Sequence, residues 1–254
     1  TERVEIGVGV TCPIGRIHPA ILAQAVATTS QLCDGRLVWG IGTGEWLNEH
    51  VTLEAWPPQP ERAAMLEEAI KLIRRLWSEK SVTHRGEYFD VTDARILDQP
   101  ETPIPVIVSA FGPTAAEVAA RTGDGLWVSG PDRKTIEKYR SAGGAGPVYG
   151  QLTVCWGEDR NTAIDLAYRL WPQTALKGQL SQDLPTIQHF EQAVQLVTRD
   201  MIEEEVACGP DIDAIVNRAN EFVASGVDHL YFHQIGPDQE GFAEVWKGDI
   251  CGAI

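Results

Sequence analysis

A carboxylate follows three closely spaced glycines in the stretch GIGTGEWLNE, residues 40–49. Gly40, Gly42 and Gly44 end an apolar run, and without a Cβ the backbone there can come close to a flat ligand. In a closed pocket, Glu45 could give or take a proton, or stabilise a charged ring. The stretch matches neither the P-loop nor the dinucleotide fingerprint. The competing interpretation is a tight turn in which Glu45 only places a negative charge at a helix start.

A second stretch, VIVSAFGPTAAEV, places a turn between a strand and a helix. The strand ends at Ala110, Phe111 and Gly112 form the turn, and the helix is expected to start at Thr114. Unpaired backbone N–H groups at a helix start are a ready site for an anion such as phosphate. An ordinary connecting loop would have the same composition, so this stretch alone leaves both interpretations open.

Three further places could contribute to a site. GVGVTCP, residues 7–13, is a strand end whose glycines indicate backbone freedom or close approach. Trp46 adjoins Glu45 and is the tryptophan expected near a ligand. His233 falls near a strand end and could line a pocket or be purely structural. The histidines lack metal-ligand spacing backed by carboxylates, so no metal is predicted.

The elements that must position these residues alternate between strand and helix. Apolar runs at 4–10, 36–42, 104–110, 124–130, 149–156 and 229–236 are separated by helical patterns at 18–32, 60–78, 113–122, 186–198 and 212–225. Strands that are apolar throughout favour a parallel sheet covered on both faces. The pattern predicts an α/β fold, a (β/α)₈ TIM barrel lacking its first two βα units, with a doubly wound sheet as the alternative. Residues 1–254 are expected to form one domain with a hairpin insertion near 80–100.

Composition limits the function classes. The formal net charge is −15, which argues against a nucleic-acid surface. No apolar stretch is long enough to cross a membrane. Five scattered cysteines indicate reduced thiols and a cytoplasmic protein. The chain opens almost inside a strand-like run, so we expect a further segment before Thr1.

Taken together, these stretches resemble the luciferase-like monooxygenase superfamily. GIGTGEWLNE, the hairpin pattern V-x-x-x-G-x-Y-x-x-V, PVIVSAFGP and RTGDGLWVSGP are most similar to the coenzyme F420-dependent oxidoreductases of the glucose-6-phosphate dehydrogenase family. The resemblance runs from Val4 to about Asp249. It implies a (β/α)₈ barrel and hydride transfer between a substrate carbon and C5 of the deazaflavin F420.

The resemblance also implies roles for individual residues. Glu45 would be the active-site acid near the deazaflavin ring, and Asn48 a cofactor contact. Gly9 and Val10 match a strand-end bulge, often a non-proline cis peptide, that backs the ring. The cofactor phosphate would lie on the turn formed by Ala110, Phe111 and Gly112. The other expected contacts are Gly44 and Cys12 for the cofactor, and Trp46, Ser129 and His233 for the substrate.

Two departures from the family pattern shape the expected substrate. The family's catalytic histidine lies on the first strand–helix segment, which this chain lacks. After Ser129, Pro131 replaces a lysine of the substrate-phosphate clamp, and cations expected near Leu180 and Glu203 are also missing. An unphosphorylated alcohol or sugar-like substrate is therefore expected. The resemblance separately implies a homodimer. The alternatives are an FMN-dependent monooxygenase and a non-catalytic barrel subunit.

Overall fold

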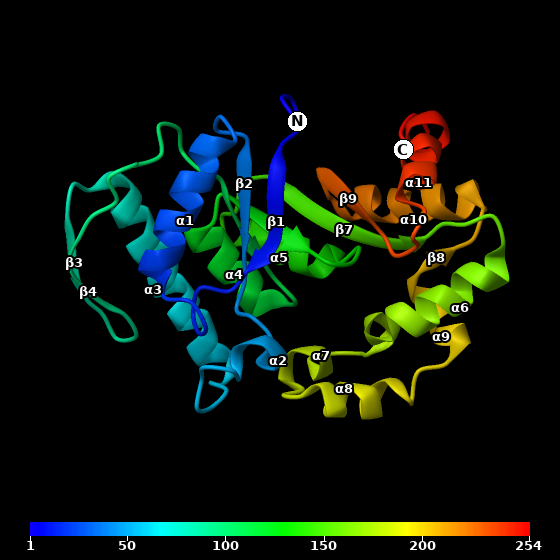
Figure 1. Ribbon diagram of the computed structural model, residues 1–254, viewed down its shortest axis with the longest axis horizontal. Helices are drawn as coiled ribbons and strands as arrows, with labels where there is room; N and C mark the ends of the chain where they lie inside the picture. Colours follow the sequence, from blue (N-terminus) through cyan, green and yellow to red (C-terminus); the bar gives the residue numbers. More distant parts are fainter. The chain divides into compact units, whose positions relative to one another are not determined.

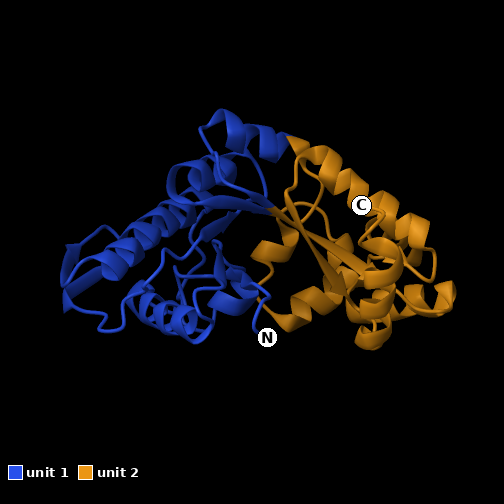
Figure 2. Ribbon diagram, turned by 90° about the horizontal axis from the view of Figure 1, so that it is seen from above, with its two compact units in different colours: residues 1–127, 134–148 blue, residues 128–133, 149–254 orange.

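Apolar runs of four to eight residues form parallel strands in the computed structural model, which describes residues 1–254. The chain divides into two compact units (Figure 2). Unit 1 comprises residues 1–127 and 134–148, and unit 2 comprises residues 128–133 and 149–254. The single domain expected from the sequence stays a prediction, and each unit is described by itself.

Unit 1 is built on a parallel sheet with the order β1, β2, β5, β6. The strands are β1 (Ile6–Thr11), β2 (Leu37–Ile41), β5 (Val106–Ser109) and β6 (Gly125–Val128). All of β2 is buried, as expected for a strand that is apolar throughout. Because neighbouring strands are parallel, their carboxyl ends lie at one edge of the sheet.

Helices connect these strands in unit 1. They are α1 (Pro19–Leu32), α2 (Trp46–Glu49), α3 (Gln59–Ser78), α4 (Pro113–Thr122) and α5 (Arg133–Ser141). Pro19 occupies the first turn of α1, and the His18 ring caps the helix by accepting the Ala20 N–H at 3.1 Å. Leu22 and Val26 of α1, like Leu66 and Ile73 of α3, lie one or two turns apart and are buried. α1 and α3 pack against each other (Figure 1).

The insertion near residues 80–100 is an antiparallel hairpin of β3 (Val82–Arg85) and β4 (Asp90–Ala94), beside α3 (Figure 1). A hairpin was predicted near residues 80–100, and its two strands lie within that range. The backbone N–H groups of Glu87, Tyr88 and Phe89 donate to the Glu68 carboxylate of α3 instead of to a partner strand.

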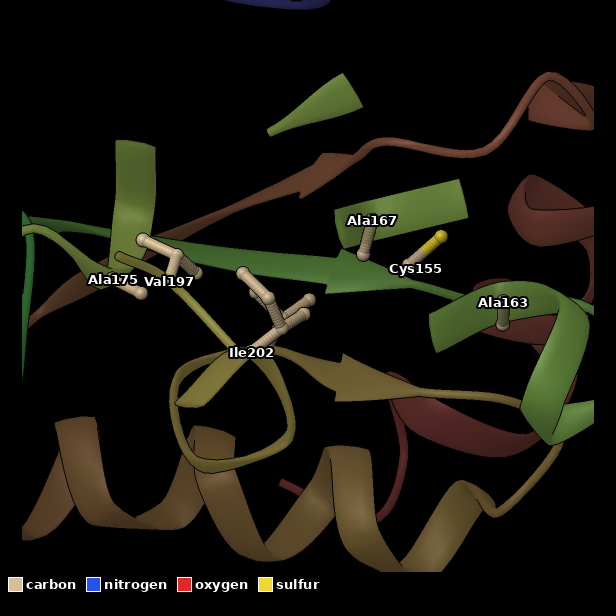
Figure 3. Close-up of a cluster of buried hydrophobic side chains, with 7 residues drawn as sticks. Cys155, Ala163, Ala167, Ala175, Val197 and Ile202 are labelled. Carbon is tan, nitrogen blue, oxygen red and sulfur yellow. The ribbon is translucent and has the colours of Figure 1, made fainter. Parts of the chain in front are cut away.

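Unit 2 is organised around β7 (Val148–Cys155), which pairs in parallel with both β8 (Ala207–Cys208) and β9 (His229–Gln234). Its longer helices are α6 (Arg160–Leu170) and α10 (Ile212–Ser225). Gly226 ends α10 with a left-handed φ of 103°, as the sequence predicts. A cluster of buried apolar side chains lies between β7, α6 and the segments that follow α6 (Figure 3): Cys155, Ala163, Ala167, Ala175, Val197, Ile202 and Val206.

Residues 172–206 differ most from expectation. The stretch before the helix predicted at 186–198 contains η1 (Pro172–Ala175) and α7 (Leu180–Asp183). The predicted helix itself ends early, as α8 (Ile187–Val194). A separate helix, α9 (Arg199–Glu205), then begins because the Thr198 side chain accepts the Met201 N–H and caps a new start. The chain ends with α11 (Gln239–Val245) and the π-helical η2 (Trp246–Ile250). No helix is long and apolar enough to cross a membrane.

Candidate active site

The carboxyl ends of β1, β2 and β5 meet in unit 1. A Cβ added to Gly42, just after β2, would lie 3.0 Å from Val10 Cγ2 and 3.5 Å from Ser109 Cβ. These neighbours come from β1 and β5, so side chains from three strands approach at this point. The segments around residues 9, 45 and 112 all follow or end these strands, and the sheet therefore brings them to one edge.

β1 is irregular near this edge. Its pairing with β2 shifts register between Val8 and Thr11, and the Gly9–Val10 peptide bond is cis. A bulge and a non-proline cis bond are therefore found where the family resemblance places them. A Cβ on Gly9 would lie 2.6 Å from Trp127 Cζ2 of β6, so only glycine allows the indole this close. Trp127 could not be singled out from the sequence, because the contact joins the first and fourth strands of the sheet.

Glu45 stands at the start of α2 with an extended backbone. Its side chain reaches solvent, yet the protein atoms around its carboxyl group raise its pKa above the ordinary value. Asn48, one turn along α2, donates its Nδ2–H to Glu45 Oε2 at 3.3 Å. The carboxyl group thus has a raised proton affinity and an oriented neighbour, which suits a group that gives or takes a proton. The side chain of Glu45 makes no capping hydrogen bond to α2, but its charge lies at the start of this helix, as the competing interpretation also expects.

The turn after β5 leads directly into α4. The helix begins at Pro113, one residue before the predicted start, and Gly112 precedes it with φ 144° and ψ 177°. A Cβ on Gly112 would meet no atom within 4 Å, and Phe111 is 66% exposed. The first main-chain bond of the helix runs from Ala116 N to Gly112 O, at 3.1 Å. The N–H groups of Thr114 and Ala115 come before that bond, at the open end of the helix.

Cys12 follows β1 and packs against Glu49 of α2, a residue that was not singled out from the sequence. Its side chain lies beside that of Glu49 in α2, since a Cβ on Gly44 would lie 2.6 Å from Cys12 Sγ and 3.1 Å from Glu49 Cγ. Burial, followed by the nearby Glu49 carboxylate, raises the pKa of the Cys12 thiol to about 12. Glu49 is 1% exposed, and its Oε2 accepts the Arg16 N–H at 2.7 Å. The structure thus places Cys12 toward Glu49, while the predicted cofactor contact of Cys12 stays a prediction.

Trp46 is held by an aromatic stack. Its ring lies 5.3 Å from that of Trp56, at an interplanar angle of 28°. The guanidinium of buried Arg62 in turn sits 4.2 Å from the Trp56 ring, and its Nη1 donates to Pro57 O. The stack fixes Trp46 beside Glu45, where a substrate contact is predicted from the sequence. Neither Trp56 nor Arg62 was predicted, because the contact depends on how residues 51–58 fold back.

The other two predicted pocket residues belong to unit 2. Ser129 follows β6, and His233 lies on β9. The His233 ring packs edge-on against Trp171, with centroids 4.7 Å apart, and its Nδ1 lies 3.4 Å from Thr153 Oγ1. Burial lowers the pKa of His233, which favours the neutral imidazole. Their contact with a substrate stays a prediction.

Comparison with known proteins identifies the family. The sequence pattern of the family described as "Luciferase-like monooxygenase" matches residues 1–229. The chain belongs to the luciferase-like monooxygenase family. The α/β-barrel class predicted from the sequence is confirmed by this membership and by the structural similarity given below.

Two proteins similar to this chain carry the same name. The chain is 35% identical to the F420-dependent glucose-6-phosphate dehydrogenase of Amycolatopsis mediterranei, over 98% of this chain and 79% of the relative. It is 36% identical to the protein of that name from Segniliparus rotundus, over 99% of this chain and 79% of the relative.

A solved structure gives a similar result. An F420-dependent secondary alcohol dehydrogenase, in complex with an F420–acetone adduct, matches with a TM-score of 0.89 at 29% identity. The match covers 100% of this chain and 80% of the dehydrogenase.

Proposed function

We propose that this luciferase-like chain is an F420-dependent oxidoreductase that transfers a hydride between a small organic substrate and C5 of the deazaflavin. The observation that carries the proposal is that relatives above 30% identity over nearly the whole chain are named F420-dependent dehydrogenases. The similar solved structure holds an adduct of F420 itself. Both kinds of relative are dehydrogenases, so the substrate class is a CH–OH donor or the corresponding carbonyl compound.

The residues of unit 1 fit this cofactor. The edge formed by β1, β2 and β5 carries glycines at positions 9, 42 and 44. A Cβ at these positions would lie 2.6, 3.0 and 2.6 Å from atoms of Trp127, Val10 and Cys12, so the missing Cβ lets the backbone pack closely along this wall of the proposed ring site. The open start of α4 at Gly112 offers N–H groups of the kind that bind phosphate. Local amide donors are needed because the net charge of −15 would otherwise repel an anionic cofactor.

Each residue then has a defined task. F420 supplies a carbon that accepts or releases the hydride. The Gly9–Val10 bulge supports the ring, and the amides after Gly112 hold the phosphate. Glu45, whose pKa is raised by its surroundings, holds the proton that must move when the ring changes its oxidation state. Asn48 orients the Glu45 carboxyl through its 3.3 Å hydrogen bond.

We further propose that the substrate is unphosphorylated. The resemblance places a phosphate clamp around Ser129, where this chain has Pro131, and near Glu203. In unit 2, Arg160 Nη2 donates to Glu203 Oε2 at 2.7 Å, so this arginine already has a carboxylate partner. The second candidate is a sugar phosphate, which the names of the relatives from Amycolatopsis and Segniliparus favour.

The decisive experiment is a parallel titration with F420 and with FMN, followed through quenching of tryptophan fluorescence. We expect saturable F420 binding and weak FMN binding. Tight FMN binding without F420 binding would instead support the FMN-dependent monooxygenase. F420 binding without turnover of any alcohol, sugar or sugar phosphate would support a non-catalytic subunit.

Substrate choice is tested by the loss of the oxidised deazaflavin absorbance. We expect kcat/KM for secondary alcohols or free sugars to exceed that for glucose 6-phosphate by at least about tenfold. This factor corresponds to the free energy of one charge-assisted contact that the phosphate would lack in this chain. The opposite ranking would replace our substrate with the sugar phosphate.

We also propose a cytoplasmic enzyme, because its five cysteines are free, as in a reducing compartment. A homodimer stays a prediction that sedimentation of the purified protein can test.

A further inference from the structure

Glu49 is a buried carboxylate that the proposed chemistry does not use. It is 1% exposed, although it lies in a four-residue helix whose other members reach solvent at least in part. A buried carboxylate is retained only where hydrogen bonds compensate its lost hydration. Its partners therefore indicate what it does.

Those partners come from a different segment of the chain. Oε2 of Glu49 accepts the Arg16 N–H at 2.7 Å, and the Cys12 side chain lies beside that of Glu49. Residues 12–16, the loop after β1, are thus fastened to α2 by Glu49.

The packing around this carboxylate leaves no spare room. A Cβ on Gly15 would lie 2.6 Å from Glu49 Oε2. A Cβ on Gly44 would lie 2.6 Å from Cys12 Sγ and 3.1 Å from Glu49 Cγ, and Gly44 has φ +76°. Glycine is therefore required on both sides of the carboxylate, in the loop after β1 and in the turn after β2.

Glu49 also shares a helical turn with the proposed acid. Its N–H donates to Glu45 O at 3.1 Å, and the Asn48 N–H donates to the same oxygen at 3.0 Å. Any shift of Glu49 relative to residues 12–16 therefore moves the turn that carries Glu45 and Asn48. The same shift changes their distance from the Gly9–Val10 bulge, which lies just before Cys12.

We infer that Glu49 is a positioning residue, which ties the loop after β1 to α2 and so fixes Glu45 relative to the wall of the cofactor site. This role rests on the proposed function, because it assigns the purpose of the tie to the F420 reaction. Glu49 itself touches neither substrate nor cofactor in this scheme. It acts through Glu45 and through the backbone of residues 12–16.

The test compares Glu49→Leu with a matched control, Glu68→Leu. Glu68 is also a carboxylate of unit 1 that accepts backbone N–H groups from a distant segment, but it holds the β3–β4 hairpin. At saturating F420 and substrate, we expect Glu49→Leu to lower kcat by about tenfold or more, because small displacements of a catalytic group are costly. Glu68→Leu should keep kcat within about twofold. Equal kcat in the two variants would overturn the inference.

A conservative variant separates positioning from general destabilisation. Glu49→Gln keeps one acceptor oxygen and the side-chain shape, so it should recover most of the kcat lost in Glu49→Leu. If Glu49→Leu does not fold, Cys12→Ser and Cys12→Ala decide the question. Serine retains a donor for Glu49 and alanine does not, so kcat should be higher with serine. Equal kcat in this second pair would contradict the tie.

Amide hydrogen exchange provides a readout that needs no cofactor. In Glu49→Leu, peptides covering residues 12–17 and 42–50 should exchange at least about tenfold faster than in the wild type and in Glu68→Leu. Failure of the wild type to bind F420 would refute the proposed function while leaving this exchange result interpretable. Unchanged exchange in Glu49→Leu would refute the tie even in an active F420 enzyme.

Discussion

At the scale of single residues, Glu45 combines a raised pKa with exposure at the start of α2. Glu45→Gln removes the titrating proton and keeps the side-chain shape, so kcat should fall by about 10²- to 10⁴-fold while F420 affinity stays within a few-fold. Steady-state kinetics combined with fluorescence titration measure both quantities. Unchanged turnover would remove Glu45 from the mechanism.

The same substitution has a defined effect on pH dependence and stability. The dependence of the wild-type kcat on pH should show an inflection at a pH above 4.5, the ordinary pKa of a glutamate, because the surroundings of Glu45 raise its pKa. Glu45→Gln should abolish that inflection. The folded state binds this proton more tightly than the unfolded chain does, so ionising Glu45 costs stability as pH rises through the raised pKa. At neutral pH, Glu45→Gln should therefore unfold at no lower temperature than the wild type, as measured by calorimetry.

At the scale of elements, the β3–β4 hairpin depends on one side chain of α3. Glu68 is a partly buried carboxylate, but hydrogen bonds from His84 and from the N–H groups of Phe89, Tyr88 and Glu87 outweigh burial and lower its pKa. Glu68→Gln should lower the free energy of unfolding by roughly 1–3 kcal/mol at neutral pH, because several N–H donors exchange a charged acceptor for a neutral one. Urea denaturation measures the change.

The pH dependence and a neighbouring residue supply the controls for Glu68. Because its pKa is depressed in the folded state, its stabilising contribution is present at neutral pH and is lost as pH falls through that pKa. The wild type and Glu68→Gln should therefore converge in stability in acid. Glu67→Gln, which alters only a surface pair with Lys71 and Arg121, should change stability by about 1 kcal/mol or less. Similar losses of stability in Glu68→Gln and Glu67→Gln would contradict the role of Glu68 in holding the β3–β4 hairpin.

These elements also show what the sequence could predict. Helix α10 was predicted with the correct ends because its apolar spacing and Gly226 are local signals. The end of the helix predicted at 186–198 was misplaced, because Thr198 accepts the Met201 N–H and starts a separate helix, α9. In the candidate site, the glycine turn and Glu45 were visible in the sequence. Glu49, Trp56 and Trp127 were not, since their contacts join segments that are distant along the chain.

At the scale of the whole molecule, the net charge of −15 opposes the approach of an anionic cofactor. The donors proposed to hold its phosphate are short-range amides after Gly112, which act only once the cofactor has arrived. Long-range repulsion is screened by salt, with a Debye length of about 30 Å at 0.01 M and about 8 Å at 0.15 M ionic strength. The association rate of F420 should therefore rise over this range of salt, whereas the dissociation rate should change little.

Stopped-flow tryptophan fluorescence measures both rates, and neutral sucrose at matched viscosity serves as the control for the medium. An association rate that falls with salt would mean that a local positive field guides the cofactor, contrary to the strongly acidic composition. A dissociation rate that rises steeply with salt would mean that side-chain cations, rather than backbone amides, hold the phosphate. The sign of each salt effect therefore separates how the cofactor reaches the site from how the site retains it.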